Sequence, residues 1–188
     1  MNLSISEKVL WQVDDLEGLP DNGDRYEIID GELFVSRSPH WEHQDAAGAI
    51  YTELRLWSQK TGLGQAAFAP GIIFSQTNNV IPDVVWVSSD RLTQLLDRAG
   101  HLTGSPELVV EVLSDSVRDK KRDRETKLKL YSTEGVSEYW IVDRQTKTVE
   151  VYRRDRGILK KTLTLFPGDR LTSPLLPEFN CEVDRLFA

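Results

Sequence analysis

The order of its segments predicts that this chain of 188 residues is an α/β (α+β) domain, with a central mixed β-sheet flanked by helices on both faces. Strand-like segments dominate the middle of the chain, and helical segments interrupt them. Residues 106–113 are apolar on both alternating faces, which is typical of a strand covered from both sides. Residues 118–133 follow with a helical period. We expect a single domain over residues 1–188.

Residues 26–35 predict a β-hairpin near the N-terminus, because two β-prone tetrads flank Asp30-Gly31, a pair that suits a two-residue turn. This register places Glu27 and Glu32 together on one face, which we expect to be the exposed one. The opposite face holds Tyr26, Ile28, Leu33 and Val35.

The remaining elements follow from hydrophobic period and from breaker residues. Apolar residues at three- and four-residue spacing predict the main N-terminal helix. The expected helices cover residues 6–16, 40–60, 91–98 and 118–133. The expected strands cover residues 65–74, 81–87, 106–113 and 137–143, with an antiparallel pair at 148–153 and 159–165. A polar turn is expected over 76–79, and a Pro-rich segment over 173–177 before a short tail.

Composition limits the classes of protein and partner. Lys and Arg number 23 against 30 Asp and Glu, a net charge of −7, which disfavours holding nucleic acid by bulk attraction alone. No apolar run approaches the roughly 18 residues that cross a bilayer, and the N-terminus has no basic region followed by an apolar stretch. We therefore expect a cytoplasmic protein with no membrane segment. The single cysteine, Cys181, excludes an internal disulfide framework and a cysteine-based zinc site.

One segment is basic against this acidic background. Residues 118–129 hold seven Lys or Arg and three Asp or Glu side chains. The segment is either a solvated helix face or a surface that contacts phosphates. In the second case the candidates for phosphate contacts are Arg118, Lys121 and Arg124.

Two carboxylates stand out in the predicted sheet. Asp83 lies at the mouth of the apolar strand 81–87, and Glu111 lies inside the strand 106–113. Burying a lone carboxylate costs several kcal/mol, so Glu111 should have a cation, a metal ion or strong hydrogen-bond donors beside it. Asp83 alone could cap a strand, and Glu111 alone could form a buried ion pair. Together, on neighbouring strands at one edge of the sheet, they are the ligands that Mg²⁺ selects.

The helix after Glu111 supplies a third group. With 3.6 residues per turn, Lys127 shares a stripe with Leu130 and Tyr131, which must anchor the helix on the sheet. Lys127 either covers apolar surface while its amine reaches water, or delivers an ammonium group to the carboxylates. The solvent side of the same helix is expected to carry Arg122, Glu125 and Lys129.

In this order and spacing, these segments resemble the Uma-two family of restriction-endonuclease-like proteins, within the PD-(D/E)XK nuclease superfamily. The resemblance covers about residues 24–154, most of the chain. Each motif is weak alone, but their order and spacing together are specific. The matching motifs are Tyr26-Glu27-Ile28-Ile29-Asp30-Gly31-Glu32-Leu33, His43, Pro82-Asp83-Val84, Glu111-Val112-Leu113-Ser114, Asp123 with Lys127 and Tyr131, and Gly135-Val136-Ser137-Glu138-Tyr139-Trp140-Ile141-Val142-Asp143.

The resemblance implies a restriction-endonuclease-like core of order α-β-β-β-α-β and cleavage of DNA phosphodiester bonds assisted by Mg²⁺ or Mn²⁺. Asp83 and Glu111 take the positions of the two acidic metal ligands, and the Val112 carbonyl is a further candidate ligand. The sequence departs from the superfamily at the lysine, because Leu113 stands two residues beyond Glu111. Lys127 matches family members in which the catalytic lysine has moved to the following helix. Superfamily analogy also implies a homodimer.

Three further residues are candidates for auxiliary roles. Glu27 and Glu32 belong to the hairpin, and His43 is either a helix-surface residue or one that hydrogen-bonds a metal ligand. Two other functions stay open. Leu113 in the lysine position and the net charge of −7 favour a catalytically inactive fold that binds nucleic acid or a protein partner. A metal-dependent hydrolase of another phosphate ester is the other alternative.

Overall fold

A central six-stranded mixed sheet organises the protein. The structure is a computed structural model, and it describes residues 9–187. The strand order is β10-β9-β8-β7-β6-β3; β7 and β8 are parallel, and the other neighbouring pairs are antiparallel. The bounds are β3 (Gly64–Phe68), β6 (Val84–Ser88), β7 (Leu108–Val112), β8 (Glu138–Asp143), β9 (Thr148–Asp155) and β10 (Ile158–Leu165).

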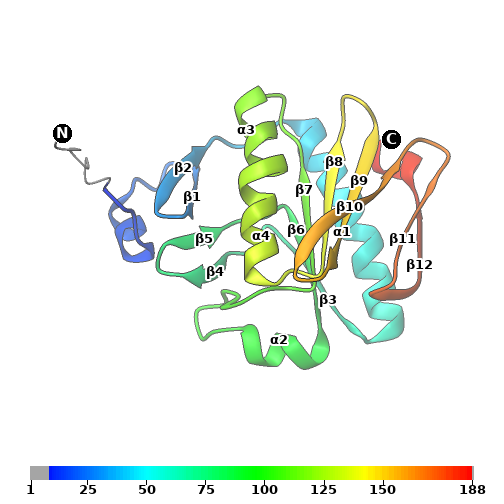
Figure 1. Ribbon diagram of the computed structural model, residues 1–188, viewed down its shortest axis with the longest axis horizontal. Coiled ribbons are helices and arrows are strands. Elements are labelled where there is room, and N and C mark those ends of the chain that lie inside the picture. Colours follow the sequence, from blue (N-terminus) through cyan, green and yellow to red (C-terminus); the bar gives the residue numbers. More distant parts are fainter. Residues whose placement is uncertain (1–8, 188) are drawn as a thin grey trace.

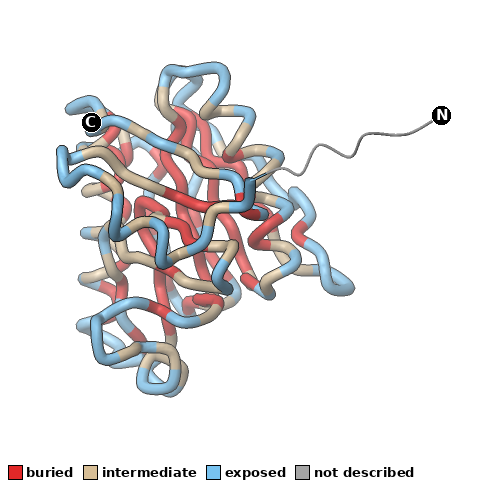
Figure 2. Tube along the Cα trace, turned by 90° about the vertical axis from the view of Figure 1, so that its left-hand side faces the viewer, coloured by how far each residue is buried: buried red, intermediate tan, exposed pale blue. Residues whose placement is uncertain are grey.

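Helices cover both faces of this sheet (Figure 1). Helix α1 (Trp41–Thr61) packs on one face, where Val84, Trp86 and Val110 point toward it. The opposite face carries Val85, Val109 and Tyr139, which pack with the other helical segment. That segment consists of α3 (Val117–Lys121), the π-helix η2 (Arg122–Lys127) and α4 (Leu128–Glu134). Figure 2 shows the buried residues concentrated in the strands between the two helical layers.

The chain follows the expected α-β-β-β-α-β order. It runs through α1, β3, β6, β7, the α3–η2–α4 segment and β8, so the predicted mixed fold is confirmed. The parallel pairing of β7 with β8 requires a crossover, and the long helical segment provides it. The predicted helices over 40–60 and 118–133 are also confirmed, within one residue at each end.

The predicted hairpin is confirmed with its register. β1 (Arg25–Ile29) pairs with β2 (Glu32–Ser36), and Ile28 lies opposite Leu33. Asp30 has a φ of 51° and Gly31 of 72°, the left-handed values that a two-residue turn requires. The hairpin belongs to a second sheet of order β2-β1-β5-β4, beside the central sheet.

The single strand expected over residues 65–74 is wrong, because it is divided between two sheets. β3 ends at Phe68 in the central sheet, while β4 (Ile72–Ser75) lies in the hairpin sheet. The break falls at Ala69, whose φ of 48° turns the chain just before Pro70-Gly71. The expected polar turn over 76–79 shortens to two residues, since β5 (Asn78–Val80) begins within it.

The ends of the chain differ from expectation more than its middle. The C-terminal part forms an unpredicted hairpin of β11 (Arg170–Ser173) and β12 (Leu176–Glu182), which packs on the α1 side of the core. The helix expected over residues 6–16 begins outside the described residues; of its described part, residues 9–12 are not helical and residues 13–16 belong to a 3₁₀ helix, η1 (Val13–Gly18). The remaining helices are α2 (Ser89–Leu95) and the 3₁₀ helix η3 (Val183–Phe187). None of the described helices is both long and apolar enough to cross a membrane.

Candidate active site

A cavity of about 380 Å³ lies where the hairpin sheet, the segment 36–40 and the helical segment α3–η2 meet the central sheet. The antiparallel pairing of β6 with β7 brings the start of β6 beside the end of β7. Asp83, directly before β6, and Glu111, near the end of β7, therefore meet at one edge, as predicted. Of the predicted site residues, the cavity is lined by Glu27, His43, Asp83, Glu111, Val112 and Lys127.

Asp83 is held on both carboxylate oxygens. Its Oδ2 accepts a hydrogen bond of 2.9 Å from the Val112 amide and lies 3.2 Å from His43 Nε2. Its Oδ1 lies 3.2 Å from Arg25 Nη1. Burial opposes ionisation, but the contacts with His43 and the Val112 amide outweigh it and lower the pKa of Asp83. Asp83 is therefore a carboxylate at neutral pH, with a fixed orientation.

Glu111 is buried beside a lysine and a tyrosine, and 4% of the residue is exposed. Its Oε1 accepts hydrogen bonds from Lys127 Nζ at 2.8 Å and from the Tyr131 hydroxyl at 2.9 Å. Burial raises the pKa of Glu111 to about 8, against the opposing effect of Lys127, and the nearby Asp123 adds to the rise. Tyr131, expected only as a packing residue, is thus also a hydrogen-bond donor in the site.

Lys127 is buried on the sheet side of the helix, as the stripe predicts. Its Nζ lies 2.8 Å from Glu111 Oε1, 2.8 Å from Glu27 Oε1 and 4.0 Å from Asp123 Oδ1. Burial disfavours the ammonium group, but these three carboxylates outweigh it and raise the pKa of Lys127 above its ordinary value. Lys129, in contrast, has a side chain that is 74% exposed.

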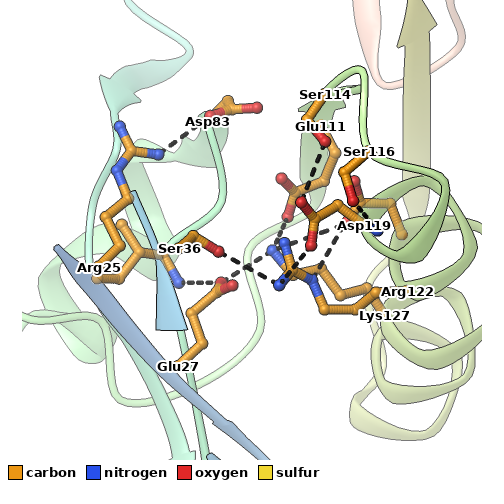
Figure 3. Close-up of polar contacts among 12 residues, drawn as sticks. Arg25, Glu27, Ser36, Asp83, Glu111, Ser114, Ser116, Asp119, Arg122 and Lys127 are labelled. Atoms are coloured by element: carbon orange, nitrogen blue, oxygen red, sulfur yellow. Dashed lines mark hydrogen bonds and ion pairs between the residues drawn. The ribbon is translucent and has the colours of Figure 1, made fainter. Parts of the chain in front are cut away.

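Arg122 was expected on the solvent side of the helix, and that expectation is wrong. Its side chain is 11% exposed, lines the cavity, and pairs with Asp119 at 3.3 Å (Figure 3). The reason is the π-helix η2, whose hydrogen bonds reach the fifth residue and so bring positions five apart, such as 122 and 127, toward one face. Asp123, one turn before Lys127, is also buried; within the described residues its Oδ1 accepts no hydrogen bond, and burial raises its pKa to about 6.

The two hairpin glutamates separate in the structure. Glu32 is exposed, as expected, but Glu27 is 3% exposed, which corrects the expectation of an exposed face. Glu27 Oε1 accepts a hydrogen bond of 2.8 Å from the Ile81 amide as well as contacting Lys127. Figure 3 shows Glu27 pointing from the hairpin toward the helix that carries Lys127. Ile29 and Phe34 share the face of Glu27, and these apolar neighbours were the available signal.

The basic strip mostly lies outside the cavity. Arg118 and Lys121 are exposed beside a shallower groove, and they stay candidates for phosphate contacts. Arg124 turns away, with Nη2 2.9 Å from Glu150 Oε1 and 3.2 Å from Asp143 Oδ2. Its guanidinium group is neutralised within the fold. Four arginines that were not among the predicted site residues do line the cavity: Arg25, Arg37, Arg122 and Arg144.

Comparison with known proteins identifies the family. The Uma2 family model, described as "Putative restriction endonuclease", matches residues 13–184. The chain belongs to the Uma2 family. A search of curated proteins finds no match. The chain is also similar to a solved structure titled as a putative nuclease belonging to DUF820 from Anabaena variabilis ATCC 29413. The TM-score is 0.75 at 18% identity, over 94% of this chain and 97% of that one, a likeness that shows the fold.

Membership of a nuclease family suggests that this Uma2 protein uses a metal ion. The question is whether the side chains around the cavity could bind one. Within residues 9–187, no three Asp, Glu, His or Cys side chains are arranged to hold a metal. Mg²⁺, however, is commonly bound by one or two carboxylates and keeps several water ligands. Within the described residues, both hydrogen bonds to the Glu111 side chain end on Oε1. Asp83 and Glu111 therefore supply two carboxylates beside one cavity, the number that a magnesium ion with several water ligands commonly takes from a protein.

Proposed function

We propose that this protein is a metal-dependent endonuclease that hydrolyses phosphodiester bonds in DNA. One observation supports the proposal most: Asp83, directly before β6, Glu111 on β7 and Lys127 on the helical segment all line one cavity. Family membership at the level of a nuclease supports the same reading. We also propose one domain over residues 1–188, a homodimer and a cytoplasmic location, on the sequence and superfamily arguments given above.

Each residue of the site has a distinct role in the proposed reaction. Asp83, Glu111 and the Val112 carbonyl would hold Mg²⁺ or Mn²⁺, which would supply activation of a water molecule and screening of the phosphate charge. Lys127 remains charged at neutral pH because Glu111 and Glu27 flank its ammonium group. That group orients the attacking water or stabilises the negative charge that grows on the phosphate in the transition state.

Leu113 occupies the position of the lysine in the superfamily motif, and its apolar surroundings explain why this chain has no lysine there. Its side chain is 1% exposed and packs in the apolar cluster that contains Leu130 and Tyr131. A lysine there would place its ammonium group in that cluster rather than in the cavity. The helical segment supplies the ammonium group instead, through Lys127. Asp123 lies one turn before Lys127 on the same segment.

A catalytically inactive nucleic-acid-binding protein is the second candidate. Internal pairing favours it, because Asp83 is paired with Arg25 and Glu111 with Lys127. In such a protein these contacts would be permanent, and the buried polar groups would serve the fold alone.

Incubation with plasmid and oligonucleotides separates these functions. The protein is assayed with Mg²⁺, with Mn²⁺ and with EDTA, beside an Asp83→Asn variant. The endonuclease proposal expects metal-dependent nicking by the wild-type protein and none by the variant, because a ligand charge is lost. Binding without cleavage supports the inactive candidate. Hydrolysis of a different phosphate ester with no nicking supports the other metal-dependent hydrolase.

A further inference from the structure

The two proposed metal ligands each hold a cation of the protein, and the two cations are held differently. Lys127 is fixed between Glu111 and Glu27 at 2.8 Å from each, and its side chain is 3% exposed. Arg25 contacts Asp83 Oδ1 at 3.2 Å, and its side chain is 23% exposed. Asp83 is its ion-pair partner within residues 9–187. Arg25 is therefore the cation that can leave.

Asp83 does not need Arg25 to keep its orientation. The other carboxylate oxygen, Oδ2, is fixed by the Val112 amide at 2.9 Å and by His43 at 3.2 Å. Release of Arg25 would free Oδ1 at the cavity wall, while Oδ2 stays in place. A buried carboxylate left without a cation is costly, so the release requires another cation to replace the guanidinium group.

We propose that Arg25 occupies the position of the metal ion at Asp83 and, when Mg²⁺ replaces it, turns to bind a phosphate group of the nucleic acid in the same cavity. This inference rests on the proposed function. Arg25 lines the cavity together with Lys127 and Glu111, so it borders the space that the substrate would enter. A guanidinium group pairs with phosphate as readily as with carboxylate, because its planar fork matches the oxygens of both.

The first test is the Mg²⁺ affinity of the metal-free protein, measured by isothermal titration calorimetry. Arg25→Met should bind Mg²⁺ about tenfold more tightly than wild type, because the competing cation is gone. Arg25→Lys, which keeps a cation, should stay near the wild-type affinity. Unchanged or weaker binding by Arg25→Met, in protein whose thermal unfolding remains cooperative, overturns the inference. Arg25→Gln repeats the measurement should the methionine variant fail to fold.

Arg37 provides the matched control. It lines the same cavity, and in the described part of the chain it has no ion-pair partner. Arg37→Met removes the same charge without releasing a carboxylate, so its Mg²⁺ affinity should change by about twofold at most. Equal tightening in both variants would show that Arg25 acts only by repelling the metal ion, which contradicts the proposal.

The second test concerns phosphate binding. Fluorescence anisotropy of a labelled oligonucleotide is measured in a Lys127→Met background, which slows cleavage. Adding Arg25→Met should weaken binding severalfold at saturating Mg²⁺ and leave it unchanged in EDTA, because without metal Arg25 is held by Asp83. Equal weakening in both conditions overturns the exchange of partners.

The outcomes also separate this inference from the proposed function. Tighter Mg²⁺ binding by Arg25→Met in a protein that never cleaves DNA supports the exchange and contradicts the endonuclease. Metal-dependent cleavage with unaltered Mg²⁺ affinity in Arg25→Met contradicts the exchange alone. Absence of Mg²⁺ binding in wild type and in Arg25→Met contradicts both.

Discussion

Two buried glutamates on the neighbouring parallel strands β7 and β8 have opposite surroundings. Glu111 is 4% exposed and Glu138 is 1% exposed, and burial raises the pKa of both. Glu138 is satisfied on each oxygen: Oε1 accepts from Trp140 Nε1 at 2.7 Å, and Oε2 accepts from Ser173 Oγ at 2.8 Å. Arg153 lies 3.5 Å from Oε2. Glu138 thereby connects β8 to β11 and lies outside the cavity.

Glu111 instead shares its cation with competitors. Lys127 is divided between Glu111 and Glu27. Asp123 Oδ1 lies 4.0 Å from the same ammonium group and 3.7 Å from Arg122 Nε, and within the described residues it accepts no hydrogen bond. Glu111 also lines the cavity. Burial alone therefore does not distinguish a structural carboxylate from a functional one. The distinction lies in whether the surrounding donors satisfy the group fully or leave excess negative charge facing an open space.

The largest expected effect separates these two residues directly. Glu111→Gln should abolish metal-dependent cleavage, lower Mg²⁺ affinity more than tenfold, and keep or raise the thermal stability of the metal-free protein, because carboxylate repulsion is relieved. Glu138→Gln should lower the free energy of unfolding by about 1–2 kcal/mol, since its hydrogen bonds are weakened, and leave Mg²⁺ affinity unchanged. Calorimetry measures both quantities. A large stability loss in Glu111→Gln with unaltered metal affinity would place Glu111 with Glu138 as a structural residue.

The next effect concerns the shared ammonium group. Lys127→Met keeps the apolar stem and should lower the cleavage rate by roughly two or more powers of ten, the range for losing a group that stabilises transition-state charge. Lys129→Met is the control on the exposed side of the same helix and should leave the rate nearly unchanged. Single-turnover kinetics make the comparison. Equal losses at both positions would indicate general phosphate attraction by the basic strip.

A smaller effect is expected at the residue that competes with Glu111. Glu27→Gln should lower the cleavage rate about tenfold with little change in KM, because the neutral side chain holds Lys127 less firmly. Its amide oxygen can still accept the hydrogen bond from Ile81. Glu32→Gln, on the same hairpin face but exposed and outside the cavity, should retain the wild-type rate. Similar kcat values for Glu27→Gln and Glu32→Gln would show that Glu27 has no role in catalysis.

The smallest effect is a pH dependence of stability. Because the pKa of Glu111 is about 8 in the folded protein against an ordinary 4.5, the folded state binds more protons between these values. The contribution of Glu111 to the free energy of unfolding therefore falls as the pH rises from about 4.5 to about 8. Scanning calorimetry in EDTA should find wild type and Glu111→Gln with similar Tm at pH 5, and the variant higher by a few degrees at pH 8.5. A Tm difference that does not vary with pH contradicts the raised pKa.

Local patterns in the sequence determined most of the core and its central residues. An apolar run on both strand faces identified β7, two β-prone segments around Asp30-Gly31 identified the hairpin, and the helical period identified the sheet-facing side of Lys127. Asp83 and Glu111 stood out because a carboxylate in an apolar strand requires a partner. These features are readable because each depends on neighbours within a few residues, where strand and helix geometry fix which side chains share a face.

Tertiary structure alone decided the rest of the site. The burial of Glu27 depends on contact with Lys127, 100 positions along the chain, and the position of Arg122 depends on a π-turn that the 3.6-residue period does not anticipate. Arg25 became a site residue only when the hairpin sheet was placed beside Asp83. The strands β11 and β12 also form through packing on the α1 side of the core. For Glu27, Arg25 and the β11–β12 hairpin the physical reason is the same: the stabilising energy comes from contacts between distant segments, and no local period records which distant side chain will lie opposite.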